Sequence, residues 1–171
     1  MKKFLLAISA FLFLSLPYLH GQDTALLKRT PYKLTVAVDK KTVYEEDLKA
    51  APYVLPDNTI QIYPGETVFI QVDQTDGLIK AIKAVKEISD SANTLTLAFT
   101  QITNGKVHQQ MMLKVVNPLP FKLSYRATIF SLQQKQWTIT DVLPVSAGLS
   151  GFESWPQIIT SIGIGKFKLE K

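Results

Sequence analysis

Histidine and cysteine supply most of the nucleophiles, general bases and metal ligands of proteins, and this chain has few of either. Its 171 residues contain no cysteine and two histidines, His20 and His108. A zinc site needs several such ligands, and a Ser-His-Asp triad needs a histidine base. Because His20 falls in a segment that we expect to be removed, any chemistry of this kind would depend on His108.

Sequence motifs for nucleophiles and phosphate groups are missing as well. Residues 148–151 read Gly-Leu-Ser-Gly and lack the spacing of a Gly-x-Ser-x-Gly elbow, and the chain has no glycine-rich phosphate loop. An acid pair or a Ser-Lys pair assembled across space stays open as an alternative. We therefore expect a protein that is not an enzyme and that has no catalytic residues, no cofactor and no metal.

Two stretches carry part of a metal-site pattern. His108, Met111 and Met112 offer groups that suit copper(I), but His108 and Met112 would lie about 13 Å apart along a strand. We expect Met111 in the core and the other two side chains outside. Residues 73–77 begin like a calcium-binding loop but have threonine at the middle position, which favours a solvated turn.

The segment 143–156 is the most unusual part of the chain, and we interpret it as a long irregular connection rich in glycine and proline. It carries Phe152, Glu153 and Trp155, which are the candidate ligand-binding residues. An exposed tryptophan can stack on a sugar ring or anchor a protein partner. Alternatively, Phe152 and Trp155 close the open end of the fold. We assign Trp137, beside Ile139, to the core.

Alternation of apolar and polar residues is the pattern that must position these side chains. It is typical of half-buried strands and occurs over 32–38, 60–62, 68–72, 94–100 and 121–129. Pro64-Gly65 suits a type II turn, and Asn104-Gly105 suits a two-residue hairpin. Asn117-Pro118 predicts a tight connection between strands over 107–116 and 121–132.

Three segments are less regular. Residues 78–88 show helical spacing of apolar residues, but their place between strands favours a strand. Residues 44–51 suit a short helix or a polar loop. In the C-terminal strand the apolar positions change from even to odd numbers, which predicts a β-bulge at Gly163 or Gly165.

Many short strands separated by turn signals predict an all-β fold, an antiparallel β-sandwich. We expect an immunoglobulin-like topology, although the Cys…Trp…Cys spacing of true immunoglobulin domains is missing. Residues 22–171 have the length of one domain, and we expect them to form a single sandwich.

The N-terminus has the three regions of a signal peptide, which we assign to residues 1–21. Lys2 and Lys3 precede an apolar run that ends before Pro17, and Gly21 offers a cleavage point. The alternative is a membrane anchor, but the run is shorter than the roughly 20 residues that span a bilayer. We expect export to a periplasm or to the extracellular space. Without cysteine the chain is not an acylated lipoprotein.

Charge and composition limit the classes of partner that the chain is expected to bind. The formal net charge of +5 falls to +3 after removal of Lys2 and Lys3, too little for a nucleic-acid binder. We expect an exported, non-enzymatic module that interacts with an envelope protein or serves as a structural component there, without a membrane span after cleavage. The alternative is a protein that binds carbohydrate or another small ligand through the 143–156 loop.

Overall fold

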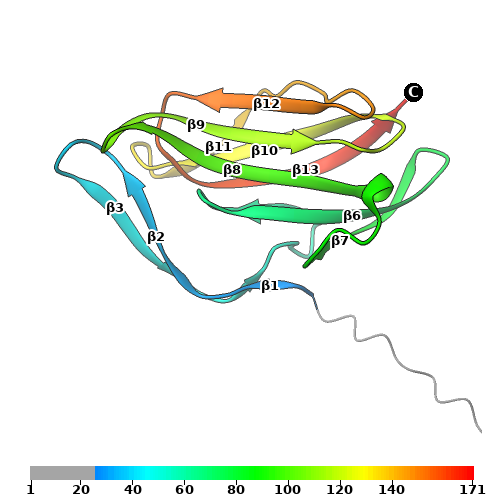
Figure 1. Cartoon of the computed structure of the whole chain (residues 1–171), viewed down its shortest axis with the longest axis horizontal. Coiled ribbons are helices and arrows are strands. Elements are labelled where there is room, and N and C mark those ends of the chain that lie inside the picture. Colours follow the sequence, from blue (N-terminus) through cyan, green and yellow to red (C-terminus); the bar gives the residue numbers. More distant parts are fainter. Residues whose placement is uncertain (1–25) are drawn as a thin grey trace, which may run out of the picture.

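Two antiparallel sheets packed face to face make up most of the described part of the chain, residues 26–171 of a computed structural model (Figure 1). The four-stranded sheet has the order β11-β10-β13-β5, with β5 (Ile60–Ile62), β10 (Lys122–Ser131), β11 (Gln136–Thr140) and β13 (Ile159–Glu170). The five-stranded sheet has the order β12-β9-β8-β6-β7, with β6 (Thr67–Thr75), β7 (Leu78–Val85), β8 (Thr94–Asn104), β9 (Val107–Val116) and β12 (Ser150–Trp155). The predicted all-β, antiparallel architecture is confirmed.

Two short antiparallel strand pairs and one helical turn complete the described chain. β1 (Lys28–Arg29) pairs with β4 (Ala51–Pro52), and β2 (Tyr32–Ala37) pairs with β3 (Val43–Leu48). The 3₁₀ helix η1 (Ser91–Asn93) leads into β8. The β2–β3 pair stands at one end of the sandwich in Figure 1. The predicted signal peptide, residues 1–21, lies outside the described residues.

The core lies between the two sheets and is built by the predicted alternation. Leu95, Leu97 and Phe99 of β8 are buried, and so are Ile162 and Ile164 of β13. Successive side chains of a strand point to opposite faces, so each of these strands gives one set to the core and the other to an outer face. The outer face of the four-stranded sheet therefore consists of the residues between the core positions.

The turns follow the residue types that the backbone requires. At residues 63–66 the Glu66 amide donates to the Tyr63 carbonyl at 3.0 Å, and Gly65 supplies the positive φ of +92° that a type II turn needs. The hairpin predicted at Asn104-Gly105 exists, but Gly105 and Lys106 occupy its two central positions. Gly105 alone of these has a positive φ, which is the type II′ form.

Residues 78–88 form a strand over Leu78–Val85, as the sequence favoured. The prediction of a short helix or polar loop at 44–51 is wrong, because Val43–Leu48 is strand β3. Its pairing with β2 is not visible in the local pattern, since the acidic run faces solvent and Leu48 alone of the strand is buried. The connection over 143–156 is irregular only as far as residue 149, and its second half is strand β12.

The predicted β-bulge of the C-terminal strand lies immediately after Gly165. Ser124 pairs with Lys168 and Arg126 pairs with Gly165, so one residue more is found on β13 than on β10. Lys166 lies within this interval and has a φ of +55°. A bulge of this kind changes which residues face the core, and it explains the change from even to odd apolar positions.

A buried asparagine holds the connection between β9 and β10. The Asn117 side-chain amide donates to the carbonyls of Phe121 (2.8 Å), Val145 (3.0 Å) and Ser146 (3.2 Å), and its Oδ1 accepts from the Leu119 amide at 3.1 Å. Asn117 is fully buried. Its side chain therefore gives the Leu119 amide a partner and supplies donors to three carbonyls of this connection, of which that of Val145 also accepts from the Leu123 amide at 2.8 Å.

The β2–β3 hairpin is attached to the sandwich by a small apolar cluster and by one side-chain amide. Leu34, Val36 and Leu48 pack with Ile158. The Gln101 Oε1 accepts from the Ala37 amide at 2.9 Å, and Gln101 Nε2 donates to the Ala37 carbonyl at 2.7 Å. This side chain takes the place of a neighbouring strand beside the last residue of β2.

A buried ion pair fixes the N-terminal strand. Arg29 is 2% exposed, and its Nε donates to Glu66 Oε1 at 2.9 Å. The Arg29 Nη2 also donates to the Gln61 carbonyl at 2.7 Å, and Glu66 Oε2 accepts from the Tyr63 amide at 2.9 Å. The guanidinium lies 4.9 Å and 4.7 Å from the ring centres of Tyr53 and Tyr63.

Replacement of Asn117 by alanine should lower the free energy of unfolding by about 2–4 kcal/mol, because the buried Leu119 amide loses its acceptor and three carbonyls lose a donor. The exposed Asn104 makes a matched control, and Asn104→Ala should change stability by less than about 0.5 kcal/mol. Urea unfolding measures both. Equal stability of the two variants would contradict this role of Asn117.

Replacement of Arg29 by methionine should cost about 3–5 kcal/mol, because it leaves the Glu66 carboxylate buried without its partner. The double variant Arg29→Met with Glu66→Gln should recover part of this loss. Lys33→Met removes the exposed pair of Lys33 with Glu45, 3.4 Å apart, and should cost at most about 1 kcal/mol. Urea unfolding of the four proteins tests the contrast; a similar cost for both single variants would show that the Arg29 pair is unimportant.

Candidate functional site

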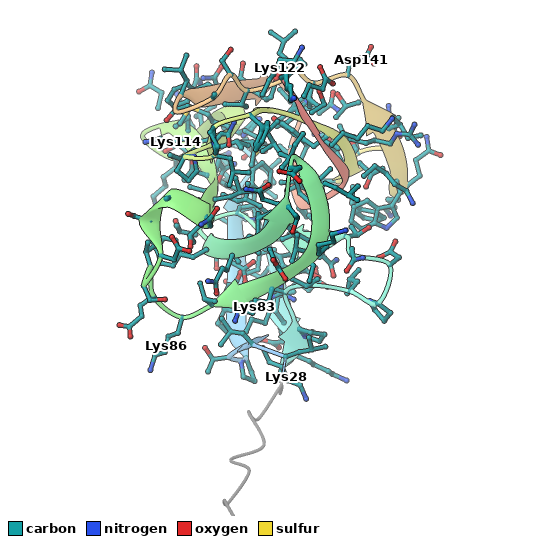
Figure 2. All side chains as sticks on the ribbon, turned by 90° about the vertical axis from the view of Figure 1, so that its right-hand side faces the viewer. Lys28, Lys83, Lys86, Lys114, Lys122 and Asp141 are labelled. Atoms are coloured by element: carbon teal, nitrogen blue, oxygen red, sulfur yellow. The ribbon has the colours of Figure 1, made fainter. Side chains whose placement is uncertain are left out.

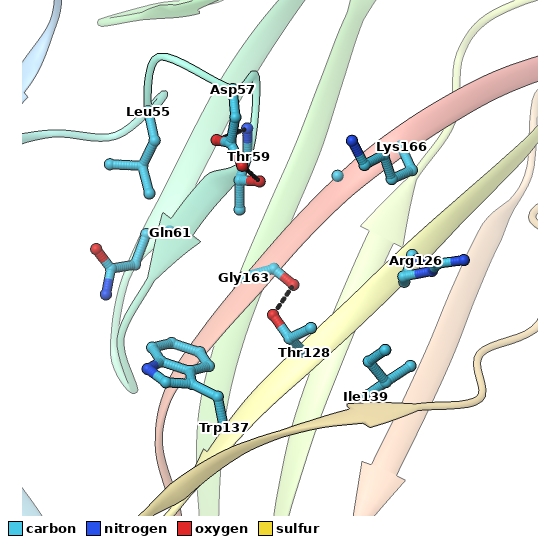
Figure 3. Close-up of a pocket in the computed structure, with 11 residues that line it drawn as sticks. Leu55, Asp57, Thr59, Gln61, Arg126, Thr128, Trp137, Ile139, Gly163 and Lys166 are labelled. Carbon is cyan, nitrogen blue, oxygen red and sulfur yellow. Dashed lines mark hydrogen bonds between the residues drawn. The ribbon is translucent and has the colours of Figure 1, made fainter.

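An open groove of about 460 Å³ lies on the outer face of the four-stranded sheet (Figure 3). Its walls come from β11 on one side and from the turn before β5 on the other. The lining residues are Leu55, Asp57, Thr59, Gln61, Arg126, Thr128, Trp137, Ile139, Gly163, Gly165 and Lys166.

Strand register places these residues together. Across the sheet, Ile139 pairs with Thr128, Thr128 with Gly163, and Gly163 with Gln61. Paired residues of neighbouring strands point to the same face, so this row crosses the groove from wall to wall. Arg126 pairs with Gly165 and begins the next row.

Two glycines of β13, Gly163 and Gly165, form the floor of the groove, where they have no side chain to fill it. A Cβ atom at Gly163 would lie 2.8 Å from Thr128 Oγ1 and 3.2 Å from Thr59 Cγ2, and one at Gly165 would lie 3.2 Å from Thr59 Oγ1. The threonine side chains thus occupy the space above the glycine backbone. Glycine inside a strand often marks a close approach of this kind, and here it leaves the groove open above the threonines.

Trp137 forms one end of the groove. Its side chain is 48% exposed, and the Phe130 ring contacts it edge-on with ring centres 5.5 Å apart at an interplanar angle of 63°. The prediction that Trp137 lies in the core is wrong. The loop over 132–135 sets the register in which Trp137 pairs with Phe130. Phe130 faces outward, so Trp137 does too. In addition, β11 is the last strand of its sheet and lies beyond the edge of the core.

Positive charge marks the opposite end of the groove. Figure 3 shows Lys166 and Arg126 across Gly163 from Trp137, and both cations are exposed. Asp57 lies on the wall near Lys166, and Thr59 donates to its carboxylate through the backbone amide at 3.0 Å and the hydroxyl at 2.9 Å. These bonds, with a smaller contribution from Lys166, hold the pKa of Asp57 below its ordinary value.

The Gln61 side chain on the β5 wall is fixed by two neighbours. Its Nε2 donates to Tyr63 Oη at 3.2 Å and to Ser161 Oγ at 3.1 Å. Burial raises the pKa of Tyr63, so this phenol stays neutral. The Gln61 carbonyl also accepts from the buried Arg29, so both the side chain and the backbone of Gln61 have fixed partners.

The structure separates the residues that the sequence proposed for ligand binding. Phe152 is 60% exposed on the outer face of the five-stranded sheet, with its ring centre 5.8 Å from Lys114 Nζ. Trp155 is 8% exposed, packs in the core, and donates from Nε1 to Thr140 Oγ1 at 3.0 Å. Glu153 Oε1 accepts from the Leu143 amide at 2.7 Å. A joint binding role for the three side chains stays a prediction.

The other candidate residues are occupied by structural contacts. Met111 is buried as predicted. His108 and Met112 lie outside the core and are half-buried, and the His108 ring nitrogens lie 2.9 Å from Gln101 Nε2 and 2.9 Å from the Pro156 carbonyl oxygen. Among residues 26–171, no group of three or more histidine, cysteine or acidic side chains is placed to hold a metal ion. Within the same range, no helix has the length and apolar character needed to cross a membrane.

Basic side chains are spread over the described surface. Figure 2 shows Lys28, Lys83 and Lys86 at one end of the molecule and Lys114 and Lys122 at the other. This agrees with the small net charge in the sequence. Arg126 and Lys166, by contrast, lie together at one end of the groove (Figure 3).

The groove escaped prediction because its residues come from four strands that become neighbours only after folding. One signal was visible, since Gly163 and Gly165 interrupt an apolar strand and indicate close backbone packing. The alternation in β10 also placed Arg126 and Thr128 on one face. The register that adds Trp137 and Gln61 to that face was not visible.

Comparisons of this chain with protein-family models, with curated proteins and with solved structures gave no match. Its function must therefore be argued from the groove itself.

Proposed function

We propose that this chain is an exported, non-enzymatic binding module whose ligand is a carbohydrate, bound in the groove on the outer face of the four-stranded sheet. The observation that carries the proposal is the exposed indole of Trp137 at the end of a groove floored by Gly163 and Gly165. The proposal keeps the ligand class expected for the 143–156 loop and moves its site to this groove.

The groove combines the two kinds of surface that a sugar requires. A pyranose has apolar C–H faces, which stack on an indole, and hydroxyl groups at its rim, which need hydrogen-bond partners. Trp137 and Ile139 offer the apolar part, and Thr59, Gln61 and Thr128 offer polar atoms nearby. A volume of about 460 Å³ is within the usual range of ligand sites, about 300–1,000 Å³.

The groove is also held in a fixed shape before any ligand arrives. Its side chains lie on paired strands, Phe130 contacts Trp137, and Gln61 is bonded to Tyr63 and Ser161. A preformed site loses less conformational entropy on binding than a mobile loop does. This supports the groove over residues 143–149, the irregular half of the predicted 143–156 loop, whereas Phe152, Glu153 and Trp155 lie beyond that half on the paired strand β12.

One observation favours a protein partner as a second candidate. β11 is the last strand of its sheet, and all but the last of its residues are exposed. An extended peptide could add to such an edge through backbone hydrogen bonds. Peptide addition would slow amide exchange across 136–140, whereas a sugar in the groove would leave the edge amides exchanging. An envelope-protein partner and an immunoglobulin-like topology both stay predictions, and the carbohydrate proposal needs neither.

Replacement of Trp137 by alanine should abolish oligosaccharide binding without unfolding the domain, because the indole is about half exposed and lies outside the core. Phe152→Ala provides the matched control, since it removes another exposed aromatic ring from a different face. A thermal-shift panel of neutral and acidic oligosaccharides reports binding, because a ligand at 100 times its Kd stabilises by about 2.7 kcal/mol. Loss of binding in Phe152→Ala and not in Trp137→Ala would place the site on β12 instead.

A further inference from the structure

The cationic end of the groove has charge without an internal partner. Among residues 26–171 the ion pairs are Arg29 with Glu66, Lys33 with Glu45 and Lys122 with Glu170. Arg126 and Lys166 thus make no salt bridge within the described chain. The one carboxylate of the lining, Asp57, has its oxygens engaged by Thr59. The groove therefore presents two cations toward solvent at one end.

The backbone places Lys166 at this end at some cost. Its φ of +55° is in the left-handed region, which non-glycine residues rarely adopt. The conformation belongs to the bulge in β13, and bulges commonly change the direction of a side chain next to a binding site. The Lys166 ammonium group lies close enough to Asp57 for its charge to contribute to the lowering of the Asp57 pKa.

The spacing of the two ends sets the length of the ligand. Trp137 pairs with Phe130, and Arg126 lies four residues earlier on the same strand β10. Four residues of extended strand span about 13 Å, which exceeds one pyranose ring. This separation of the two backbone positions favours a ligand of more than one sugar ring.

We propose that the ligand is an acidic oligosaccharide, with one neutral face stacked on Trp137 and the carboxylate of a uronic acid bound between Arg126 and Lys166. This inference rests on the carbohydrate-binding function proposed above. A carboxylate is favoured because the planar guanidinium of arginine matches its two oxygens. Asp57 limits the affinity, since its negative charge stands on the wall of the same groove.

Three probes separate the possibilities in calorimetric titrations of the protein. They are an oligogalacturonide of several rings, the same oligosaccharide with its carboxylates reduced to alcohols, and a sulfated oligosaccharide of equal length. The oligogalacturonide should bind about tenfold or more tightly than its reduced form, as expected for loss of a charged hydrogen bond. It should also bind more tightly than the sulfated probe.

Charge variants locate the acid group. Arg126→Gln and Lys166→Asn should each weaken binding of the oligogalacturonide by about tenfold and leave binding of the reduced probe unchanged. Asparagine suits position 166 because it tolerates a positive φ. Asp57→Asn keeps an acceptor for Thr59 and should strengthen binding of the acidic probe. Lys106→Gln, in an exposed turn away from the groove, is the matched control and should have no effect.

The outcomes distinguish the two proposals. Equal affinity for the acidic and the reduced probes, with both lost in Trp137→Ala, would overturn the acidic ligand and leave carbohydrate binding intact. Equal affinity for the sulfated and the carboxylated probes would overturn the carboxylate in favour of anions in general. Binding of the acidic probe that Trp137→Ala does not weaken would overturn both. No binding of any of the three probes would overturn the acidic ligand, and the oligosaccharide panel described above then decides whether carbohydrate binding stands.

Discussion

The buried pair of Arg29 and Glu66 is the constraint on which the N-terminal strand and the β5 side of the groove depend. It connects β1 to the turn that precedes β6, and through the Gln61 carbonyl it also fixes β5. A buried charge is tolerated only where its partners are held in place. The pair therefore acts less as a source of stability than as a geometric constraint, and the β5 wall of the groove inherits its position from it.

The β-bulge at Lys166 links the core to the groove. Before the bulge, the even-numbered isoleucines Ile162 and Ile164 face the core, while Gly163 and Gly165 face the groove. At the bulge the alternation changes, and a lysine reaches the outer face where the strand would otherwise continue its pattern. The glycine floor therefore ends at Gly165, and the cationic end of the groove begins at Lys166. The same β-bulge thus determines both which residues of β13 pack in the core and where the groove carries positive charge.

The sequence predicted local structure well and long-range pairing poorly, for a physical reason. The alternation in β8 or β10 and the glycine at the turn of Tyr63–Glu66 depend on residues close in the chain, and these predictions were confirmed. Strand β3 and the outward direction of Trp137 depend on a partner strand and its register, which no local pattern contains. Among the candidate site residues, the alternation of β12 separates Phe152 from Trp155, and it could be recognised only once residues 150–155 were known to be a strand.

The glycines of β13 show why the groove is more than a gap in the packing. Glycine in the middle of a strand lowers stability by roughly 0.5–1 kcal/mol relative to alanine, and Gly163 and Gly165 both lie on a strand with neighbours on each side. Threonine side chains settle into the space that the missing Cβ atoms leave, so the loss in strand stability is partly offset by close contacts. Larger residues at these positions would collide with Thr59 and Thr128, whose side chains lie over the glycine backbone and line the groove. A surface shaped in this way, with rigid walls, an aromatic end and a cationic end, meets the physical requirements for binding an extended polar ligand.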